Sequence, residues 1–125
     1  MFVDYLQLLK DENRDFEKRN QIANIIYDCK GFAQHYKIPI VLISASNRAS
    51  VESEKGPGLE NIAESDVVSY AVDVALSLYQ TDEEKLTNTM NIRCVKNRHG
   101  RQISTKLNWD IDNSIITEIG NERSK

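Results

Sequence analysis

The order of apolar and polar positions predicts a strand, a helix and a second strand in the first 44 residues. Residues 2–9 form an apolar run with one acid, which predicts a buried strand. Residues 38–44 form an aliphatic run without alternation, which is typical of a strand covered on both faces in a parallel sheet. Between them, after a charged segment over residues 10–20, a spacing of three and four predicts an amphipathic helix whose inward face carries Ile22, Ile25, Ile26, Cys29, Ala33 and Tyr36. Strand, helix, strand is a βαβ unit and predicts an α/β fold.

The middle of the chain predicts a loop, a helix and a strand. Residues 45–58 have no apolar periodicity and include the turn-forming triplet Gly56-Pro57-Gly58, so we expect a mobile loop. Residues 59–71 are helix-like, and residues 72–79 predict a strand that holds one acid, Asp73. The side chains expected to point inward from this helix are Ile62, Val67 and Tyr70.

The last third predicts a small antiparallel sheet. After a polar connection over residues 80–89, alternating runs at residues 90–95 and 103–109 indicate a β-hairpin with a basic tip. Residues 115–119 predict a last short strand, followed by a polar tail. We find no internal repeat and no low-complexity tract.

The composition fits one small globular domain, because 40% of the 125 residues are hydrophobic and only 5 are Gly and 2 Pro. The longest apolar runs have the length of strands, so we expect no membrane span, and the N-terminus lacks the pattern of a signal peptide. A cytoplasmic protein is expected. Cys29 and Cys94 have no Cys-x-x-Cys spacing and are expected to be buried free thiols.

The charge is concentrated in one region. The 25 residues from 85 to 109 carry +6, whereas the other 100 carry -9. A basic surface on an acidic domain indicates an anionic partner that binds at one place. The alternative is that Lys85 and Lys106 belong to the solvated face of a hairpin.

Polar side chains follow the first two predicted strands, where ligands of α/β sheets bind. Asp4 is a candidate for holding Mg²⁺, directly or through water, although an aspartate that caps a turn is the more common explanation. Ser44 and Asn47-Arg48 lie at the equivalent edge, with ordinary turn chemistry as the alternative. A hydrogen bond to a neighbouring loop would account for Asp73 without any function.

Lys96 and Arg98 are the most informative cations. At positions i and i+2 of a strand their side chains project to the same side, where an ammonium and a guanidinium suit phosphate oxygens. Such a pair fits either a nucleotide phosphate or nonspecific nucleic-acid contact. His35 and His99 have no metal-ligand or triad neighbour and receive no catalytic role.

In this order, four segments resemble the C-terminal ATPase domain of the DnaB-like replicative helicases, which have a RecA-like fold. The string Asp4-Tyr5-Leu6-Gln7 is similar to the family's Walker B strand, and Lys96-Asn97-Arg98-His99-Gly100 to its Lys-Asn-Arg-x-Gly element. The other two are the helix ending Lys30-Gly31-Phe32-Ala33 with residues 38–48, and the region from Leu59 to Tyr79.

This resemblance implies that residues 1–120 form the C-terminal portion of a RecA-like P-loop NTPase core, followed by a polar tail at 121–125. This portion would consist of a βαβ unit and a β-hairpin, and its three-layer α/β/α arrangement would be incomplete. It implies that ATP and Mg²⁺ are the cofactors. The implied partners are single-stranded DNA and either the other helicase subunits of a hexamer or further copies of this chain. Asp4 would be the Mg²⁺-associated aspartate, and Ser44 and Asn47 would bind the nucleotide with it. Lys96 and Arg98 would be the cations that act on the nucleotide of the adjacent subunit, with Arg98 as the arginine finger. DNA contacts would come from Arg48, Lys55 and Arg101.

The chain also departs from the family pattern. Ala45 stands where the family has a Gln that senses the γ-phosphate, and Tyr70 stands where it has another Gln. The family's Arg-Glu-Ser-Gly step is Ala63-Glu64-Ser65-Asp66 here. No GxxxxGK[ST] loop occurs in the 125 residues, and the family's catalytic glutamate is absent as well.

We therefore expect a fragment or truncated homologue of an ATP-dependent replicative DNA helicase that is inactive alone and exposes an unpaired edge. The start at Met1 fits an expressed fragment, a split or degenerate gene, or an internal start. The alternatives are a non-catalytic regulatory module that assembles with an intact helicase, and a remnant of another RecA-like ATPase.

Overall fold

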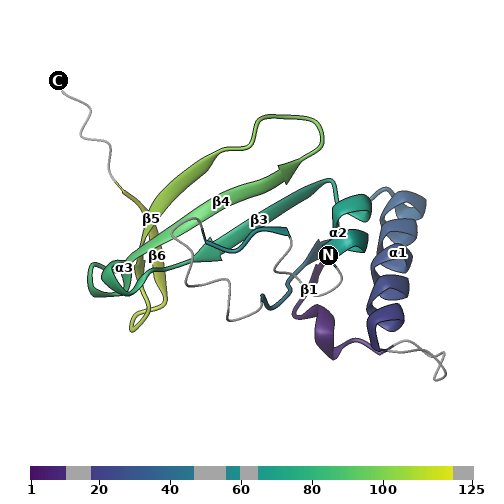
Figure 1. Cartoon of the computed structure of the whole chain (residues 1–125), viewed down its shortest axis with the longest axis horizontal. Coiled ribbons are helices and arrows are strands. Elements are labelled where there is room, and N and C mark those ends of the chain that lie inside the picture. The colour runs from purple at the N-terminus through teal and green to yellow at the C-terminus, as the bar shows by residue number, and fades with distance from the viewer. Residues whose placement is uncertain (11–17, 47–55, 60–64, 120–125) are drawn as a thin grey trace.

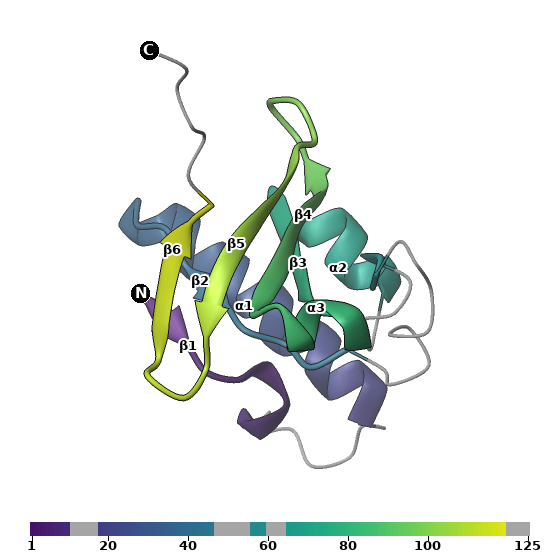
Figure 2. The same cartoon turned by 90° about the vertical axis from the view of Figure 1, so that its left-hand side faces the viewer.

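The computed structural model describes residues 1–10, 18–46, 56–59 and 65–119, and these form two sheets with helices beside the smaller one. Strand β1 (Phe2–Val3) pairs in parallel with β2 (Val41–Leu42), and the helices of this part are η1 (Leu6–Leu8), α1 (Lys18–Tyr36) and α2 (Ser65–Ala71). Strands β3 (Val74–Tyr79), β4 (Thr89–Asn97), β5 (Ser104–Asp110) and β6 (Ile115–Glu118) form an antiparallel meander, with α3 (Asp82–Leu86) between β3 and β4. Figure 1 shows the meander extending away from α1 and α2, and Figure 2 shows the β4–β5 loop projecting from it.

The core lies where η1, α1 and α2 meet. Its buried side chains are those of Leu6, Ile22, Ile25, Ile26, Val68 and Ala71. The predicted inward face of α1 is confirmed at Ile22, Ile25 and Ile26, while Cys29 is partly buried and Tyr36, at the helix end, is exposed. Burial of this face holds α1 against η1 and α2.

The two N-terminal strands are shorter and less covered than predicted. The chain leaves β1 after two residues, because Leu6 turns into the core and donates its backbone N–H to the carbonyl of Ile43. The 3-10 turn η1, over residues 6–8, occupies the second half of the segment 2–9 that was predicted to be a strand. Val41 and Ile43 remain exposed, since β1 is the only described strand that pairs with β2, so the prediction of a strand covered on both faces was wrong.

Two predictions for the middle of the chain also need correction. Tyr70 is 76% exposed instead of inward, because α2 turns Val68 and Ala71, three residues apart, towards the core. Ile62 lies outside the described residues. The expected polar connection over residues 80–89 contains α3, whose N-terminus is closed by a capping box of Thr81 and Glu84.

The hairpin and the last strand are confirmed. Strands β4 and β5 pair from Thr89 with Asn108 to Arg93 with Ser104, and β6 continues the sheet. Pairing of β3 with β4 shifts register between Ala75 and Leu76, which marks a β-bulge beside the end of β4.

The predicted turn triplet begins at a glycine that the fold requires. Gly56 has φ +66, and a Cβ there would lie 2.3 Å from Cε1 of Tyr79. Residues 56–58 are buried, so this segment packs close to β3. Residues 47–55, the greater part of the expected loop, lie outside the described residues.

Candidate functional site

Lys96 and Arg98 both reach the carboxyl end of α2. Lys96 Nζ donates to the carbonyl of Ser69, and Arg98 Nη2 donates to the carbonyl of Tyr70 at 2.7 Å. The last carbonyls of a helix have no partner within the helix and carry partial negative charge, so two cations stabilise this end. The structure therefore brings the predicted pair together at the end of α2, although β4 ends at Asn97 and Arg98 is not part of a strand as predicted.

Asp73, in the turn between α2 and β3, joins this pair to α1. Its Oδ1 accepts from Arg98 Nη1 at 2.9 Å and its Oδ2 accepts from Lys30 Nζ at 2.5 Å. Its backbone carbonyl accepts from the N–H of Arg98 at 2.8 Å. The hydrogen bond from Lys30, with the charges of Lys30 and Arg98, outweighs the loss of hydration and holds the pKa of Asp73 below its usual value.

Asp4 and Ser44 both follow strands of the parallel sheet, at its carboxyl edge. The register pairs Val3 with Leu42, so both residues follow neighbouring strand ends, as predicted. Asp4 is exposed and does not end a buried strand. Ser44 Oγ accepts from Gln7 Nε2 at 2.9 Å. No group of three metal-binding side chains occurs among the described residues. A single exposed carboxylate, that of Asp4, fits the one or two protein carboxylates through which Mg²⁺ is commonly bound.

The other predicted site residues are only partly placed. Arg101 is exposed in the β4–β5 loop, where Asn97 Nδ2 donates to its carbonyl at 3.1 Å. Asn47, Arg48 and Lys55 lie outside the described residues. Within the described chain, the hydrogen bonds of the Ser44 hydroxyl lead to Gln7 and to the carbonyl of Ala45, so they do not connect this edge with the Lys96 and Arg98 pair.

Lys30 and Gln7 are contributors that the sequence reasoning missed. Lys30 is partly buried in α1, one turn after Ile26, and a single lysine there carries no signal in the sequence. Gln7 was only part of a matched motif, although a Gln just beyond an apolar strand end is suited to bonding the next strand. Its side chain fixes Ser44 and also donates to the carbonyl of Ala45 at 3.4 Å.

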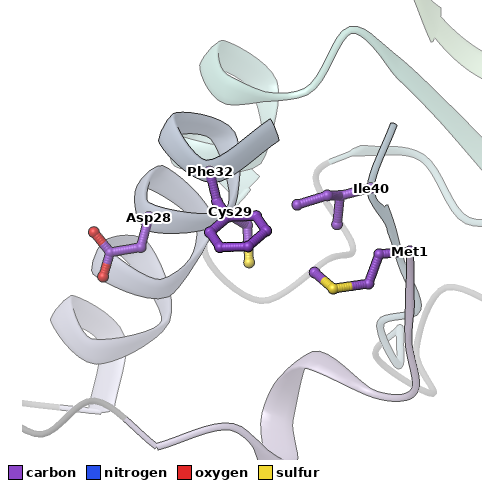
Figure 3. A pocket seen from close by; sticks show the side chains of 5 residues that line it. All are labelled: Met1, Asp28, Cys29, Phe32 and Ile40. Atoms are coloured by element: carbon purple, nitrogen blue, oxygen red, sulfur yellow. The ribbon is translucent and has the colours of Figure 1, made fainter. Parts of the chain in front are cut away.

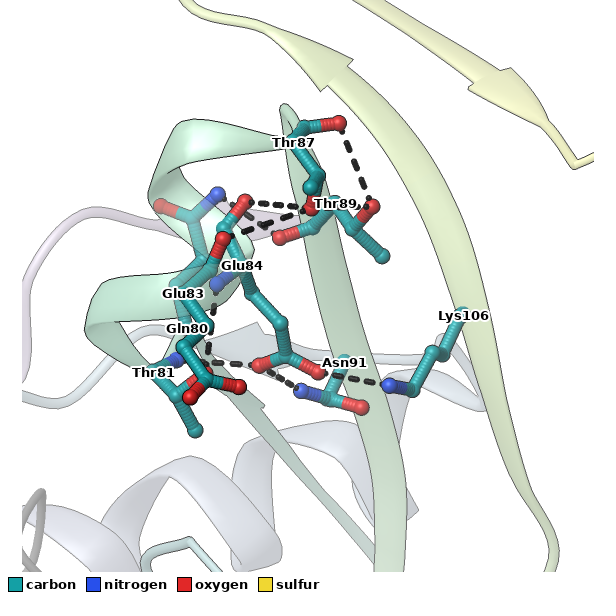
Figure 4. A network of polar contacts seen from close by, with 8 residues as sticks. All are labelled: Gln80, Thr81, Glu83, Glu84, Thr87, Thr89, Asn91 and Lys106. Atoms are coloured by element: carbon teal, nitrogen blue, oxygen red, sulfur yellow. Dashed lines mark hydrogen bonds and ion pairs between the residues drawn. The ribbon is translucent and has the colours of Figure 1, made fainter.

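A second network fixes α3 to the meander (Figure 4). Glu84 Oε1 accepts from Lys106 Nζ at 2.7 Å, while Oε2 accepts from the backbone of Thr81 and from Asn91. The hydrogen bond from Lys106, together with those from Thr81 and Asn91, lowers the pKa of Glu84 to about 2. The signal for this network was the Thr81-x-x-Glu84 pattern, which predicts a capping box.

An apolar hollow lies between α1 and the parallel sheet (Figure 3). It is lined by Met1, Asp28, Cys29, Phe32 and Ile40, and the carboxylate of Asp28 points away from it. Burial, followed by the charge of Asp28, raises the pKa of the Cys29 thiol. Cys29 and Cys94 are both free thiols, and Cys94 is buried as expected, whereas Cys29 is only partly buried. The lining offers no convergent polar groups for a ligand.

A search of the described residues finds no helix long and apolar enough to cross a membrane.

Comparison with known proteins gives consistent matches. Residues 1–117 match the family described as "DnaB-like helicase C terminal domain". The chain is 31% identical over 114 residues to a "Probable plasmid replicative DNA helicase" of Chlamydia psittaci, covering 88% of this chain and 25% of that protein. The corresponding protein of Chlamydia muridarum is 32% identical over 123 residues, covering 95% and 26%. The chain thus spans about a quarter of the length of the curated relatives it matches.

Solved structures share the fold. A solved structure described as an "ATPase Domain" matches with a TM-score of 0.85 at 24% identity, covering 95% of this chain and 44% of that one. A chain from "The Structure Of A DnaB-Like Replicative Helicase And Its Interactions With Primase" matches with a TM-score of 0.84 at 24% identity, covering 93% and 29%. The predicted RecA-like architecture is therefore confirmed.

Proposed function

The chain belongs to the DnaB-like helicase C-terminal domain family, and on that premise we propose that it forms part of an ATP-driven replicative DNA helicase and does not hydrolyse ATP by itself. The relatives that match are replicative DNA helicases. The second half of the proposal follows from the 125 residues themselves, which contain no GxxxxGK[ST] loop to hold the β- and γ-phosphates.

In this proposal, Lys96 and Arg98 act on the triphosphate bound by an adjacent subunit of a ring. The supporting observation is that both cations are held at the carboxyl end of α2, with the Arg98 side chain still 41% exposed. Cations supplied in this way stabilise the negative charge that develops during phosphoryl transfer. Backbone and side-chain contacts orient the two residues before any nucleotide arrives, which reduces the entropy lost on binding.

Asp4 is the residue that would hold Mg²⁺ at the sheet edge, directly or through water, and Ser44 would contact the nucleotide. Asp4 offers an exposed carboxylate, and Gln7 donates a hydrogen bond to the Ser44 hydroxyl at the end of the neighbouring strand. The ion, when bound, neutralises charge on the phosphate oxygens. Asn47 follows the same strand and belongs to this group in the family resemblance.

Single-stranded DNA is the proposed anionic partner of the basic region. Arg101 sits in the exposed β4–β5 loop, and Arg48 and Lys55 belong to a segment outside the described residues. Lysine and arginine side chains bind the phosphate backbone without reading its sequence, as a translocating motor requires.

A mixed-subunit assay tests the proposal. The partner is an intact DnaB-like helicase in which the Lys and Arg of its own Lys-Asn-Arg element are replaced by Ala, so that it keeps the phosphate loop and loses the cations. The chain alone should hydrolyse ATP at the buffer rate. Added to this partner, it should restore Mg²⁺-dependent hydrolysis, and Arg98→Ala should lower the restored rate by about 10³-fold.

Lys85→Ala is the matched control, because Lys85 is an exposed lysine that pairs locally with Asp82 in α3. It should restore hydrolysis as well as the unmodified chain does. Equal rescue by Arg98→Ala, a failure to co-sediment with the partner, or Mg²⁺-dependent hydrolysis by the chain alone would each contradict the proposal.

A further inference from the structure

Arg98 is held at three points, of which two fix its guanidinium. The backbone N–H donates to the carbonyl of Asp73, Nη1 donates to the Asp73 carboxylate, and Nη2 donates to the carbonyl of Tyr70. We propose that Asp73 is a positioning residue that aims the Arg98 guanidinium at the phosphate of the neighbouring nucleotide, an inference that rests on the function proposed above.

The geometry of the two side-chain contacts fixes the plane of the guanidinium. Nη1 and Nη2 are different nitrogens of one rigid group, so partners on both remove rotation about the terminal bonds of the side chain. An unrestrained arginine side chain samples many rotamers, and it loses this conformational entropy when it binds a phosphate. Asp73 removes this freedom in advance.

The guanidinium is restrained but not enclosed. The Arg98 side chain is 41% exposed and the Asp73 side chain is 47% exposed, so an anion from outside can reach the group without displacing α2. The contacts with Asp73 and Tyr70 use two of its five N–H donors. The remaining donors are those that a phosphate would take.

Lys30 prevents the aspartate from cancelling the charge of the arginine. It occupies the second carboxylate oxygen at 2.5 Å, so Lys30, Asp73 and Arg98 together carry +1, and the adjacent Lys96 raises this to +2. An aspartate paired with Arg98 alone would leave a neutral pair. The arrangement therefore orients the arginine and keeps a positive field for an anion.

The first arm of the test uses the chain alone and measures the mobility of Arg98 by NMR. The rate of rotation about the Arg98 guanidinium C–N bonds should rise about tenfold or more in Asp73→Asn, the factor expected for the loss of one charge-assisted hydrogen bond. Asp112→Asn is the control, since it removes the same charge from an exposed turn. An unchanged rotation rate in a folded Asp73→Asn chain would overturn the inference.

The second arm uses the mixed-subunit assay. Asp73→Asn should lower kcat about tenfold with KM for ATP nearly unchanged, and should have no further effect in a chain that already carries Arg98→Ala. If Asp73 had only a structural role, the losses in kcat caused by Asp73→Asn and Arg98→Ala would add in the double variant. Equal kcat for Asp73→Asn and the unmodified chain would overturn the inference.

Asp73→Glu keeps the charge and covers the case in which Asp73→Asn does not fold. It displaces the carboxylate by one methylene, so kcat should fall while the unfolding midpoint stays close to that of the unmodified chain. A kcat equal to that of the unmodified chain would count against positioning. If Arg98→Ala itself has no effect on hydrolysis, the proposed function fails, whereas the NMR arm still decides whether Asp73 orients Arg98.

Discussion

Two carboxylates of this chain each hold separate elements together, and their surroundings differ. Asp73 connects α1 with the end of β4 at the surface, with about half of its side chain exposed. Glu84 connects α3 with β4 and β5, and only 13% of its side chain is exposed. Water screens the first group much more than the second, so Glu84 is the residue at which a change in charge should affect stability.

Glu84→Gln should therefore destabilise the chain by about 1–2 kcal/mol at pH 7, because a partly buried charge-assisted hydrogen bond is lost. The pKa of Glu84 is about 2 in the folded chain against an ordinary value of 4.5, so its contribution is fully present above pH 4.5. It should disappear as the pH falls from there to about 2. Urea unfolding of both proteins between pH 7 and pH 3 measures the difference.

Glu83→Gln is the control, as Glu83 is an exposed neighbour in the same helix with the same charge. It should leave the unfolding free energy within about 0.5 kcal/mol of the unmodified value. A difference between Glu84→Gln and the unmodified chain that stays constant down to pH 3 would show that the carboxylate charge is not the cause.

Residue positions were predictable where the backbone alone decides them. Parallel strands place Asp4 and Ser44 at one edge. Lys96 and Arg98 do contact the same helix end, but Arg98 lies just beyond Asn97, the last residue of β4, so strand alternation does not account for its position. The partners Lys30 and the carbonyl of Tyr70 were not predictable, because they come from helices whose packing onto the sheet has no local signal. The roles of these site residues stay predictions.

At the scale of elements, the β4–β5 hairpin carries the cations that, in the proposed function, contact single-stranded DNA. Figure 1 shows its loop at the opposite end of the meander from α3, and Arg101 is exposed in that loop. Phosphate contacts release counterions, so binding through this loop should depend on salt concentration.

Arg101→Ala should weaken binding of single-stranded DNA and reduce the slope of log K against log salt by about 0.7, the value for one phosphate contact on a single strand. Fluorescence anisotropy with a labelled oligonucleotide from low to moderate salt measures this. Lys85→Ala should leave the slope unchanged, since its charge is paired with Asp82. Identical slopes for Arg101→Ala and the unmodified chain would rule out a DNA contact at the loop.

Helices and strands were easier to predict from the sequence when interactions between residues close in sequence stabilise them. The hairpin β4–β5 was predicted from alternation, and α1 from its apolar face. The lengths of β1 and β2 were overestimated, because a strand extends only as far as its neighbours pair with it, and each has one described neighbour. Helix α3 is five residues long and depends on its cap, so apolar periodicity gave no signal for it.

At the scale of the whole molecule, exposed apolar surface is the most notable feature. Leu76 and Leu78 are 61% and 59% exposed on one face of β3, an edge strand of the meander. Phe2 on β1 is 79% exposed. Edge strands with apolar faces pair with other chains, and apolar surface of this kind is normally covered by protein.

We therefore expect the purified chain to self-associate in a concentration-dependent manner that ATP does not alter, as sedimentation velocity would show. Leu78→Glu should shift the equilibrium towards monomer by about tenfold or more, because burying the new charge is costly. Ser104→Glu adds the same charge to the opposite face of the sheet and should have little effect. A monomer at all concentrations that nevertheless joins intact helicase rings would favour the regulatory-module alternative.

The strand order of the meander has a consequence for how the chain acquires its structure. Each of its strands pairs with the next one in sequence, whereas Phe2 must find Val41 and Leu6 must find α2. Closing a short loop loses less entropy than closing a long one, so hairpins form early and distant pairings late. During synthesis β1 leaves the ribosome before α2, yet its surroundings are complete only once α2 has packed against Leu6. The meander, which is made after β1, therefore folds more independently, and β1 depends for longer on protection from aggregation.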